Sequence, residues 1–156
     1  MRMDTDPYRS QDVSGGPSIL VIDDEPPIRR LLGLFLQGCG YRTMLAANGI
    51  EARSAVATDS VSLILCDAHL QGESGLALVR DLLRQCPHMV GLIMSGDGHD
   101  SQWAADLREE GVYGRIAKPF DAQEVADRIA KALCGRRLPE ESPHRRDTPW
   151  WPWGGV

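Results

Sequence analysis

Four short apolar runs in this sequence each end in side chains that can bind a metal ion or a phosphate group. The first run ends in Asp23 and Asp24, and the second ends in Asp67. A third run ends in Ser95, and a fourth leads to Lys118. If these runs are parallel strands, their carboxyl ends meet at the edge where open α/β sheets bind ligands. The sequence therefore predicts one crevice that collects three carboxylates, a hydroxyl and an ammonium group.

The types of these side chains favour phosphoryl transfer. Carboxylates packed together repel one another, and a divalent cation relieves that repulsion. Mg²⁺ prefers oxygen ligands and keeps several waters, so two or three carboxylates are enough to hold it. The metal and Lys118 would neutralise the charge of a transferring phosphoryl group. A carboxylate can act as the nucleophile and form an acyl phosphate, and Ser95 can donate a hydrogen bond to a phosphate oxygen.

The elements that must position these residues alternate regularly along the chain. Strands are predicted over residues 18–23, 43–46, 62–66, 90–95 and 113–117. Helices are predicted behind Pro26 and Pro27, over 48–57, through Leu76–Leu83, over 99–110, and after a capping box at Asp121 and Glu124. Such βαβ connections are right-handed, which makes the strands parallel. The predicted fold is α/β, a doubly wound five-stranded parallel sheet of order 2-1-3-4-5 with five helices.

Composition narrows the class of protein. The chain has 156 residues, of which 42% are apolar and 25% are charged, as in a globular domain. Its net charge of −5 argues against a nucleic-acid partner. Its apolar runs are too short to span a membrane. The four cysteines, Cys39, Cys66, Cys86 and Cys134, are scattered, which favours reduced thiols in a cytoplasmic protein over a metal or disulfide site.

Four segments, in this order, resemble the receiver domains of bacterial two-component response regulators. They are Val-Ile-Asp-Asp-Glu-Pro at 21–26, Leu-Cys-Asp at 65–67, Ile-Met-Ser-Gly at 93–96 and Lys-Pro-Phe at 118–120. The resemblance covers about residues 18–134. It implies a flavodoxin-like fold and Mg²⁺ as cofactor. It also implies that the phosphoryl group comes from a phosphohistidine on a sensor histidine kinase or a histidine phosphotransfer protein.

The resemblance also implies a role for each matching residue. Asp67 is the implied phosphoacceptor, Ser95 the switch hydroxyl and Lys118 the lysine that binds the phosphate. The Lys118–Pro119 peptide bond is typically cis in the family. The implied metal ligands are Asp23, Asp24, Asp67 and the backbone carbonyl of His69.

The sequence departs from the family pattern in three ways. Gln71 stands where a proline is usual, four residues after the acceptor, although Gly75 matches the usual glycine. His69 and Asp97 occupy the variable positions that modulate how long the family's phosphates last. Arg115 replaces the usual aromatic switch residue, which predicts an uncoupled or rerouted switch. We expect Arg115 to be largely exposed and available to an acidic partner. Tyr113 lies on the same face of the strand, but at about 7 Å it is a poor direct replacement for the aromatic ring.

The expected organisation is a flexible segment at 1–17, a receiver domain at 18–134 and an Arg-, Pro- and Trp-rich tail at 135–156. No second domain is recognisable after Cys134. We therefore expect a stand-alone receiver domain that changes shape toward an unknown downstream protein or passes its phosphoryl group onward. It should catalyse only its own phosphorylation and dephosphorylation, and not act as an enzyme on other substrates.

Two other functions compete with this interpretation. A phospho-independent adaptor with a receiver fold is favoured by Arg115 but disfavoured by the intact set of carboxylates, hydroxyl and lysine. A flavin carrier or flavodoxin-like enzyme would need a Ser-, Thr- or Gly-rich phosphate loop after the first strand. Residues 23–25 are instead acidic and repel phosphate unless a metal is bound.

Overall fold

The central feature of the structure, a computed structural model that describes residues 16–96 and 111–135, is a five-stranded parallel sheet. Its strands are β1 (Ser18–Ile22), β2 (Arg42–Ala46), β3 (Leu63–Asp67), β6 (Val90–Ser95) and β7 (Val112–Ala117). Their order is β2-β1-β3-β6-β7, which confirms the predicted order 2-1-3-4-5 and the doubly wound α/β class.

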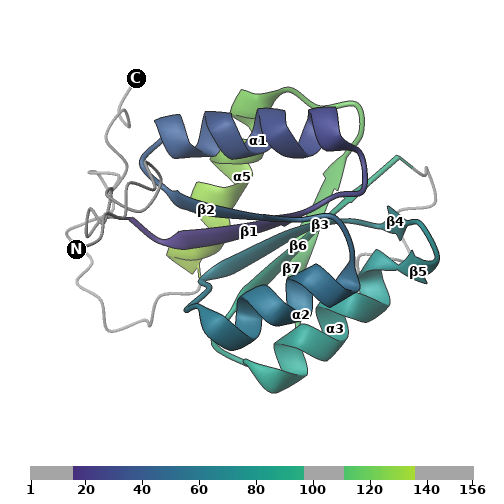
Figure 1. The fold of residues 1–156 in the computed structure, drawn as a ribbon. Coiled ribbons are helices and arrows are strands. Elements are labelled where there is room, and N and C mark those ends of the chain that lie inside the picture. Colours follow the sequence, from purple (N-terminus) through teal and green to yellow (C-terminus); the bar gives the residue numbers. More distant parts are fainter. Residues whose placement is uncertain (1–15, 97–110, 136–156) are drawn as a thin grey trace, which may run out of the picture.

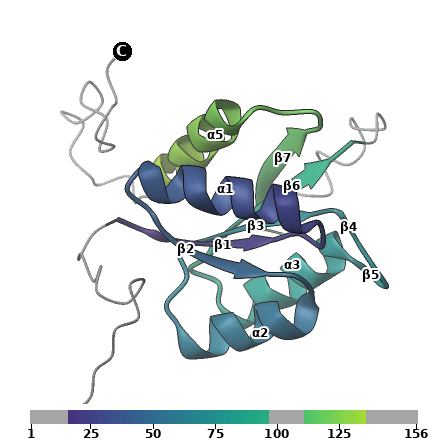
Figure 2. The same ribbon diagram turned by 45° about the horizontal axis from the view of Figure 1, so that its top comes forward.

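Four helices in the described part of the chain cover the two faces of the sheet. They are α1 (Pro26–Gly38), α2 (Gly49–Thr58), α3 (Gly75–Gln85) and α5 (Ala122–Gly135). Helices α1 and α5 lie on one face, and α2 and α3 lie on the other (Figures 1 and 2). The helix predicted over 99–110, with Trp103, lies outside the described residues, as do Asp97, nearly all of segment 1–17 and the tail beyond Gly135.

Strands β1 and β3 read as continuous apolar runs because both of their faces are buried. Successive side chains of a strand point to opposite faces. Ile19 and Val21 accordingly pack in the apolar cluster that includes α1 and α5. Leu20 and Ile22 pack in the cluster that includes α2 and α3. This double burial places both strands inside the sheet, and their parallel pairing brings their carboxyl ends, with the acidic residues, to the same edge.

Side-chain caps begin three of the helices. The Asn48 side chain accepts a hydrogen bond from the N–H of Glu51 at 2.9 Å before α2, and Ser74 caps α3 in the same way. The Asp121 side chain accepts a hydrogen bond from the N–H of Glu124 at 2.7 Å, which confirms the Asp121 half of the capping box predicted before α5. Such caps satisfy N–H groups that have no partner within the helix.

A small hairpin that the sequence did not predict follows the carboxyl end of β3. Strands β4 (His69–Leu70) and β5 (Glu73–Ser74) pair antiparallel, and Gly72 in their turn has a φ of 81°. The chain then enters α3 at Gly75, where an added Cβ would collide with the backbone oxygen of Asp67. Glycine at position 75 is therefore what allows the hairpin and α3 to close against the end of β3.

The four cysteines are free thiols in the structure and lie at different depths. Cys39 and Cys66 are buried, Cys86 is half-buried and Cys134 is exposed, so only part of the set fills the core. Burial raises the pKa of Cys39 to about 11.

Candidate phosphoacceptor and metal site

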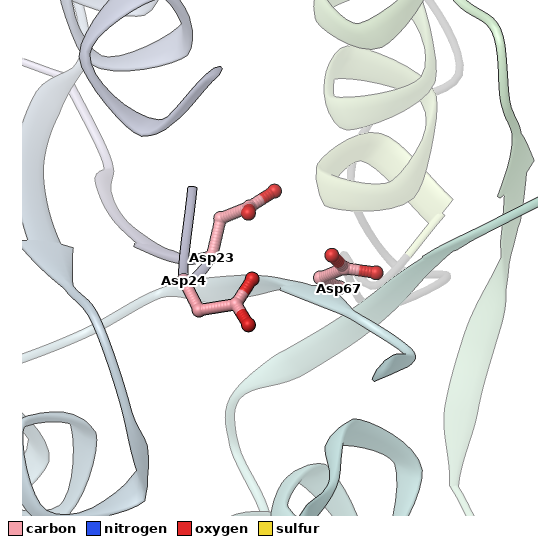
Figure 3. Close-up of side chains that lie close together, drawn as sticks. All are labelled: Asp23, Asp24 and Asp67. Atoms are coloured by element: carbon pink, nitrogen blue, oxygen red, sulfur yellow. The ribbon is translucent and has the colours of Figure 1, made fainter. Parts of the chain in front are cut away.

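Asp23, Asp24 and Asp67 come together at the carboxyl ends of two neighbouring strands. In the register of β1 and β3, Ile22 is paired with Cys66, so the residues that follow lie side by side. The three carboxylates have oxygen atoms within 4.8 Å of one another and point toward a common space (Figure 3). The structure therefore brings these three side chains together in one cluster.

Asp23 is the most deeply buried member of the cluster, with no exposed side-chain surface. Its Oδ1 accepts a hydrogen bond from the N–H of Glu25 at 2.9 Å, whereas its Oδ2 is buried without a hydrogen-bond partner in the described part of the chain. Burial raises the pKa of Asp23, the charge of Asp67 raises it further, and the Glu25 N–H opposes that shift. The ionised form is thus costly without a cation.

Asp24 is half-buried at the rim of the cluster. Its Oδ2 accepts a hydrogen bond from the backbone N–H of Gln71 at 3.0 Å. Gln71 lies in the turn of the β4–β5 hairpin, 47 residues farther along the chain. The residue that departs from the family pattern therefore contacts the site directly.

Asp67 lies at the end of β3 with 6% of its surface exposed. Its Oδ2 is 3.2 Å from the Nζ of Lys118, and its Oδ1 accepts a hydrogen bond from the N–H of His69 at 3.2 Å. The Lys118–Pro119 bond is cis, in agreement with the resemblance. Asp67 thus lies between an acidic pair and a cation, at a point that solvent can still reach.

Ser95 ends β6 and is buried, with 1% of its surface exposed. Strand β6 lies between β3 and β7, so Ser95 belongs to the same edge of the sheet as the carboxylates. Its backbone carbonyl accepts a hydrogen bond from the N–H of Lys118 at 2.9 Å. The β6–β7 pairing therefore fixes the position of Ser95 relative to Lys118 along the edge of the sheet.

Arg115 is half-buried, so the prediction that it is largely exposed is wrong. Its Nη2 donates to the backbone carbonyl of Ser95 on the neighbouring strand at 3.3 Å. The guanidinium finds a backbone acceptor across the sheet instead of extending into water. Tyr113 is more exposed, at 44%, and its hydroxyl donates to the carbonyl of Lys131 in α5 at 3.4 Å.

The donor set fits Mg²⁺. Three carboxylates offer the hard oxygen ligands that this ion prefers, and few protein ligands are enough because Mg²⁺ usually keeps several waters. The buried Oδ2 of Asp23, without a hydrogen-bond partner among the described residues, is an acceptor that a cation would satisfy. His69 has an exposed side chain and contacts Asp67 through its N–H. Its carbonyl as a fourth ligand stays a prediction.

Sequence reasoning missed three contacts that shape the site, because all of them involve backbone N–H groups. They are the Glu25 N–H on Asp23, the Gln71 N–H on Asp24 and the His69 N–H on Asp67. Every residue except proline carries such a donor, so residue type does not reveal it.

In the described ranges, no helix is long and apolar enough to cross a membrane.

Comparison with known proteins agrees with this geometry. A family model described as the response regulator receiver domain matches residues 19–130. The receiver domain protein of Clostridium thermocellum is similar in structure, with a TM-score of 0.69 and 28% identity over 78% of this chain and 97% of that one. NtrX from Brucella abortus has a TM-score of 0.72 and 32% identity, over 80% of this chain but 29% of that one.

Curated relatives differ in how much of their length is matched. Sporulation initiation phosphotransferase F of Bacillus subtilis is 31% identical over 115 residues, which are 74% of this chain and 92% of that protein. The C4-dicarboxylate transport transcriptional regulatory protein DctD of Rhizobium meliloti is 30% identical over 83% of this chain, which spans 28% of that protein's length. From the match over residues 19–130 and the strand order around Asp67, the chain belongs to the response regulator receiver domain family.

Proposed function

We propose that this chain accepts a phosphoryl group on Asp67 in a Mg²⁺-dependent reaction and signals in its phosphorylated form. The observation that carries the proposal is the placement of Asp67 itself. Its carboxylate lies between the carboxylates of Asp23 and Asp24 and the ammonium of Lys118. Phosphoryl transfer requires a nucleophile placed next to positive charges that neutralise the transferring group. Here the nucleophile is the Asp67 carboxylate, and the charges are a metal ion at the acidic cluster and the Lys118 ammonium.

The proposed donor is a phosphohistidine on a sensor histidine kinase or a histidine phosphotransfer protein. A carboxylate oxygen of Asp67 attacks phosphorus, the P–N bond to the donor imidazole breaks, and the imidazole leaves with the electron pair and takes up a proton. Asp23, Asp24 and Asp67 would hold Mg²⁺, which supplies charge neutralisation when it is bound. Lys118 lies where it can bind a phosphate oxygen once the acyl phosphate forms.

The next step in signalling is proposed to occur on another protein in the cytoplasm. Onward transfer of the phosphoryl group is supported by the similarity to a protein named as a phosphotransferase, matched over 92% of its length. Docking of the phosphorylated form on a downstream protein is the second route. In either case the chain acts only on its own phosphoryl group and is not an enzyme for other substrates.

A phospho-independent adaptor is the alternative function, and the replacement of the aromatic switch residue by Arg115 favours it. The buried Asp23 carboxylate argues against it. A protein that binds neither metal nor phosphate gains nothing from keeping three repelling carboxylates together.

The test is the intact mass of the full chain after incubation with acetyl phosphate. We expect one added phosphoryl group in the presence of Mg²⁺ and almost none in EDTA. The adduct should be removed by hydroxylamine, because an acyl phosphate reacts with this nucleophile and a phosphoserine does not. Labelling that is independent of Mg²⁺, or that resists hydroxylamine, would contradict the proposal.

Beryllofluoride, as a phosphoryl mimic, should change the surface formed by β7 and α5 less in the wild type than in Arg115→Tyr. Arg115 is bonded to the Ser95 carbonyl, and burying its guanidinium without a partner costs several kcal/mol. A tyrosine ring carries no such charge and can turn inward. The readout is the set of backbone NMR shift changes in residues 112–117 and 122–135. Wild-type changes as large as those of the tyrosine variant would overturn this expectation.

A further inference from the structure

Contacts of Gln71, Glu73 and Leu70 attach the β4–β5 hairpin to the rest of the fold. The N–H of Gln71 donates to Asp24 Oδ2 at 3.0 Å. The carboxylate of Glu73 accepts from the N–H of Gly49, the first residue of α2, at 2.9 Å. Leu70 packs in the apolar core with 7% of its surface exposed. A hairpin with two residues per strand has little stability of its own, so these attachments hold its turn against the site.

The contact with Gln71 restricts a side chain that is otherwise loosely held. Asp24 is half-buried, and this is the hydrogen bond that the described part of the chain provides to its carboxylate. Asp23, in contrast, is held by complete burial and by the Glu25 N–H. The orientation of Asp24 toward the cluster therefore depends on the hairpin turn.

We infer that the backbone N–H of Gln71 positions Asp24 for Mg²⁺ binding at the proposed phosphorylation site. The inference rests on the proposed function, because it concerns the same metal. Groups that hydrogen-bond to metal-ligating carboxylates hold them in place, and losing one typically lowers metal affinity. A proline, the residue usual at this position in the resembled family, has no N–H and cannot make this contact. Position 71 thus sets metal affinity through its backbone.

Proline and alanine at position 71 separate the backbone effect from the side-chain effect. Gly72 follows with a φ of 81°, and turns with positive φ at the second central residue accept proline at the first. Leu70 is in a strand, the conformation that a following proline favours. Gln71→Pro therefore removes the N–H with little strain, whereas Gln71→Ala keeps it.

The experiment is a Mg²⁺ titration of the full chain, followed by the amide NMR signals of residues 66–70. Gln71→Pro should weaken Mg²⁺ binding about tenfold, while Gln71→Ala should bind as the wild type does. The melting temperature without Mg²⁺ should be the same for both variants. If the Gln71 N–H served only to stabilise the turn, Gln71→Pro would instead melt at a lower temperature than Gln71→Ala. Equal Mg²⁺ affinities of the two variants would overturn the inference.

Two further variants keep the test decisive. Asp24→Asn should lose Mg²⁺ binding, and a normal affinity there would refute the metal site of the proposed function along with the inference. Glu73→Ala, which releases the hairpin from α2, should speed amide exchange at Gln71 and weaken Mg²⁺ binding in the same direction. If Gln71→Pro does not fold, Glu73→Ala decides the test. Faster amide exchange at Gln71 together with an unchanged Mg²⁺ affinity would then overturn the inference and leave the proposed function standing.

Discussion

Asp67→Asn should abolish the addition of a phosphoryl group from acetyl phosphate. The amide is nearly the same size as the carboxylate and keeps an oxygen for the His69 N–H, which now bonds Oδ1 at 3.2 Å. It is not a nucleophile, and it removes the negative charge that faces Lys118. We therefore expect a folded protein whose intact mass stays unchanged under conditions that label the wild type.

The control for this variant is Asp81→Asn. Asp81 lies on α3, and its ion pairs with Arg53 and Arg84 join side chains that are about half exposed or more. Losing them costs little stability, and the residue belongs to none of the site's contacts. Asp81→Asn should label as fast as the wild type does. Equal labelling of Asp67→Asn would instead show that another residue is the acceptor.

The sheet and the acidic cluster could be predicted because several independent features of the sequence indicate the same arrangement. Residues 18–23 and 62–66 are apolar on both faces, as only a central strand requires. Once the strands are parallel, Asp23 and Asp67 must meet at one edge. The predicted boundaries of these two strands differ from the observed ones by one residue: β1 ends before Asp23, and β3 runs from Leu63 to Asp67.

The hairpin β4–β5 could not be predicted in the same way. Each of its strands has two residues, too few for any hydrophobic periodicity to show. Its stability comes from contacts with Asp24 and Gly49, which are distant in sequence. Gln71 was recognised as a departure from the family pattern, but a backbone donor gives no sign in the residue type.

The position of Arg115 was wrongly predicted for a related reason. On an edge strand such as β7, an arginine can send its charged end into water along its aliphatic stem. It can equally reach a carbonyl of the adjacent strand, as Arg115 does at Ser95. The sequence does not distinguish these outcomes, because the acceptor is a backbone oxygen and depends on the β6–β7 register.

Asp23→Asn should stabilise the metal-free protein and remove the stabilisation that Mg²⁺ gives. Asp23 is fully buried, and its pKa is raised chiefly by burial. Asparagine keeps an oxygen for the Glu25 N–H. It replaces the unpartnered Oδ2 by an amide that can donate to the nearby carboxylates. We expect a gain of about 1–3 kcal/mol without metal, the scale of an unsatisfied buried group.

Thermal unfolding with and without Mg²⁺ measures both parts of this prediction. A ligand at 100 times its Kd stabilises a folded protein by about 2.7 kcal/mol, so saturating Mg²⁺ should raise the melting temperature of the wild type and leave Asp23→Asn nearly unchanged. Asp24→Asn is the matched control. It also removes a ligand, but its carboxylate is half-buried and hydrogen-bonded by Gln71, so its metal-free gain should be smaller. A metal-free Asp23→Asn protein less stable than the wild type would show that the buried carboxylate is satisfied without a cation.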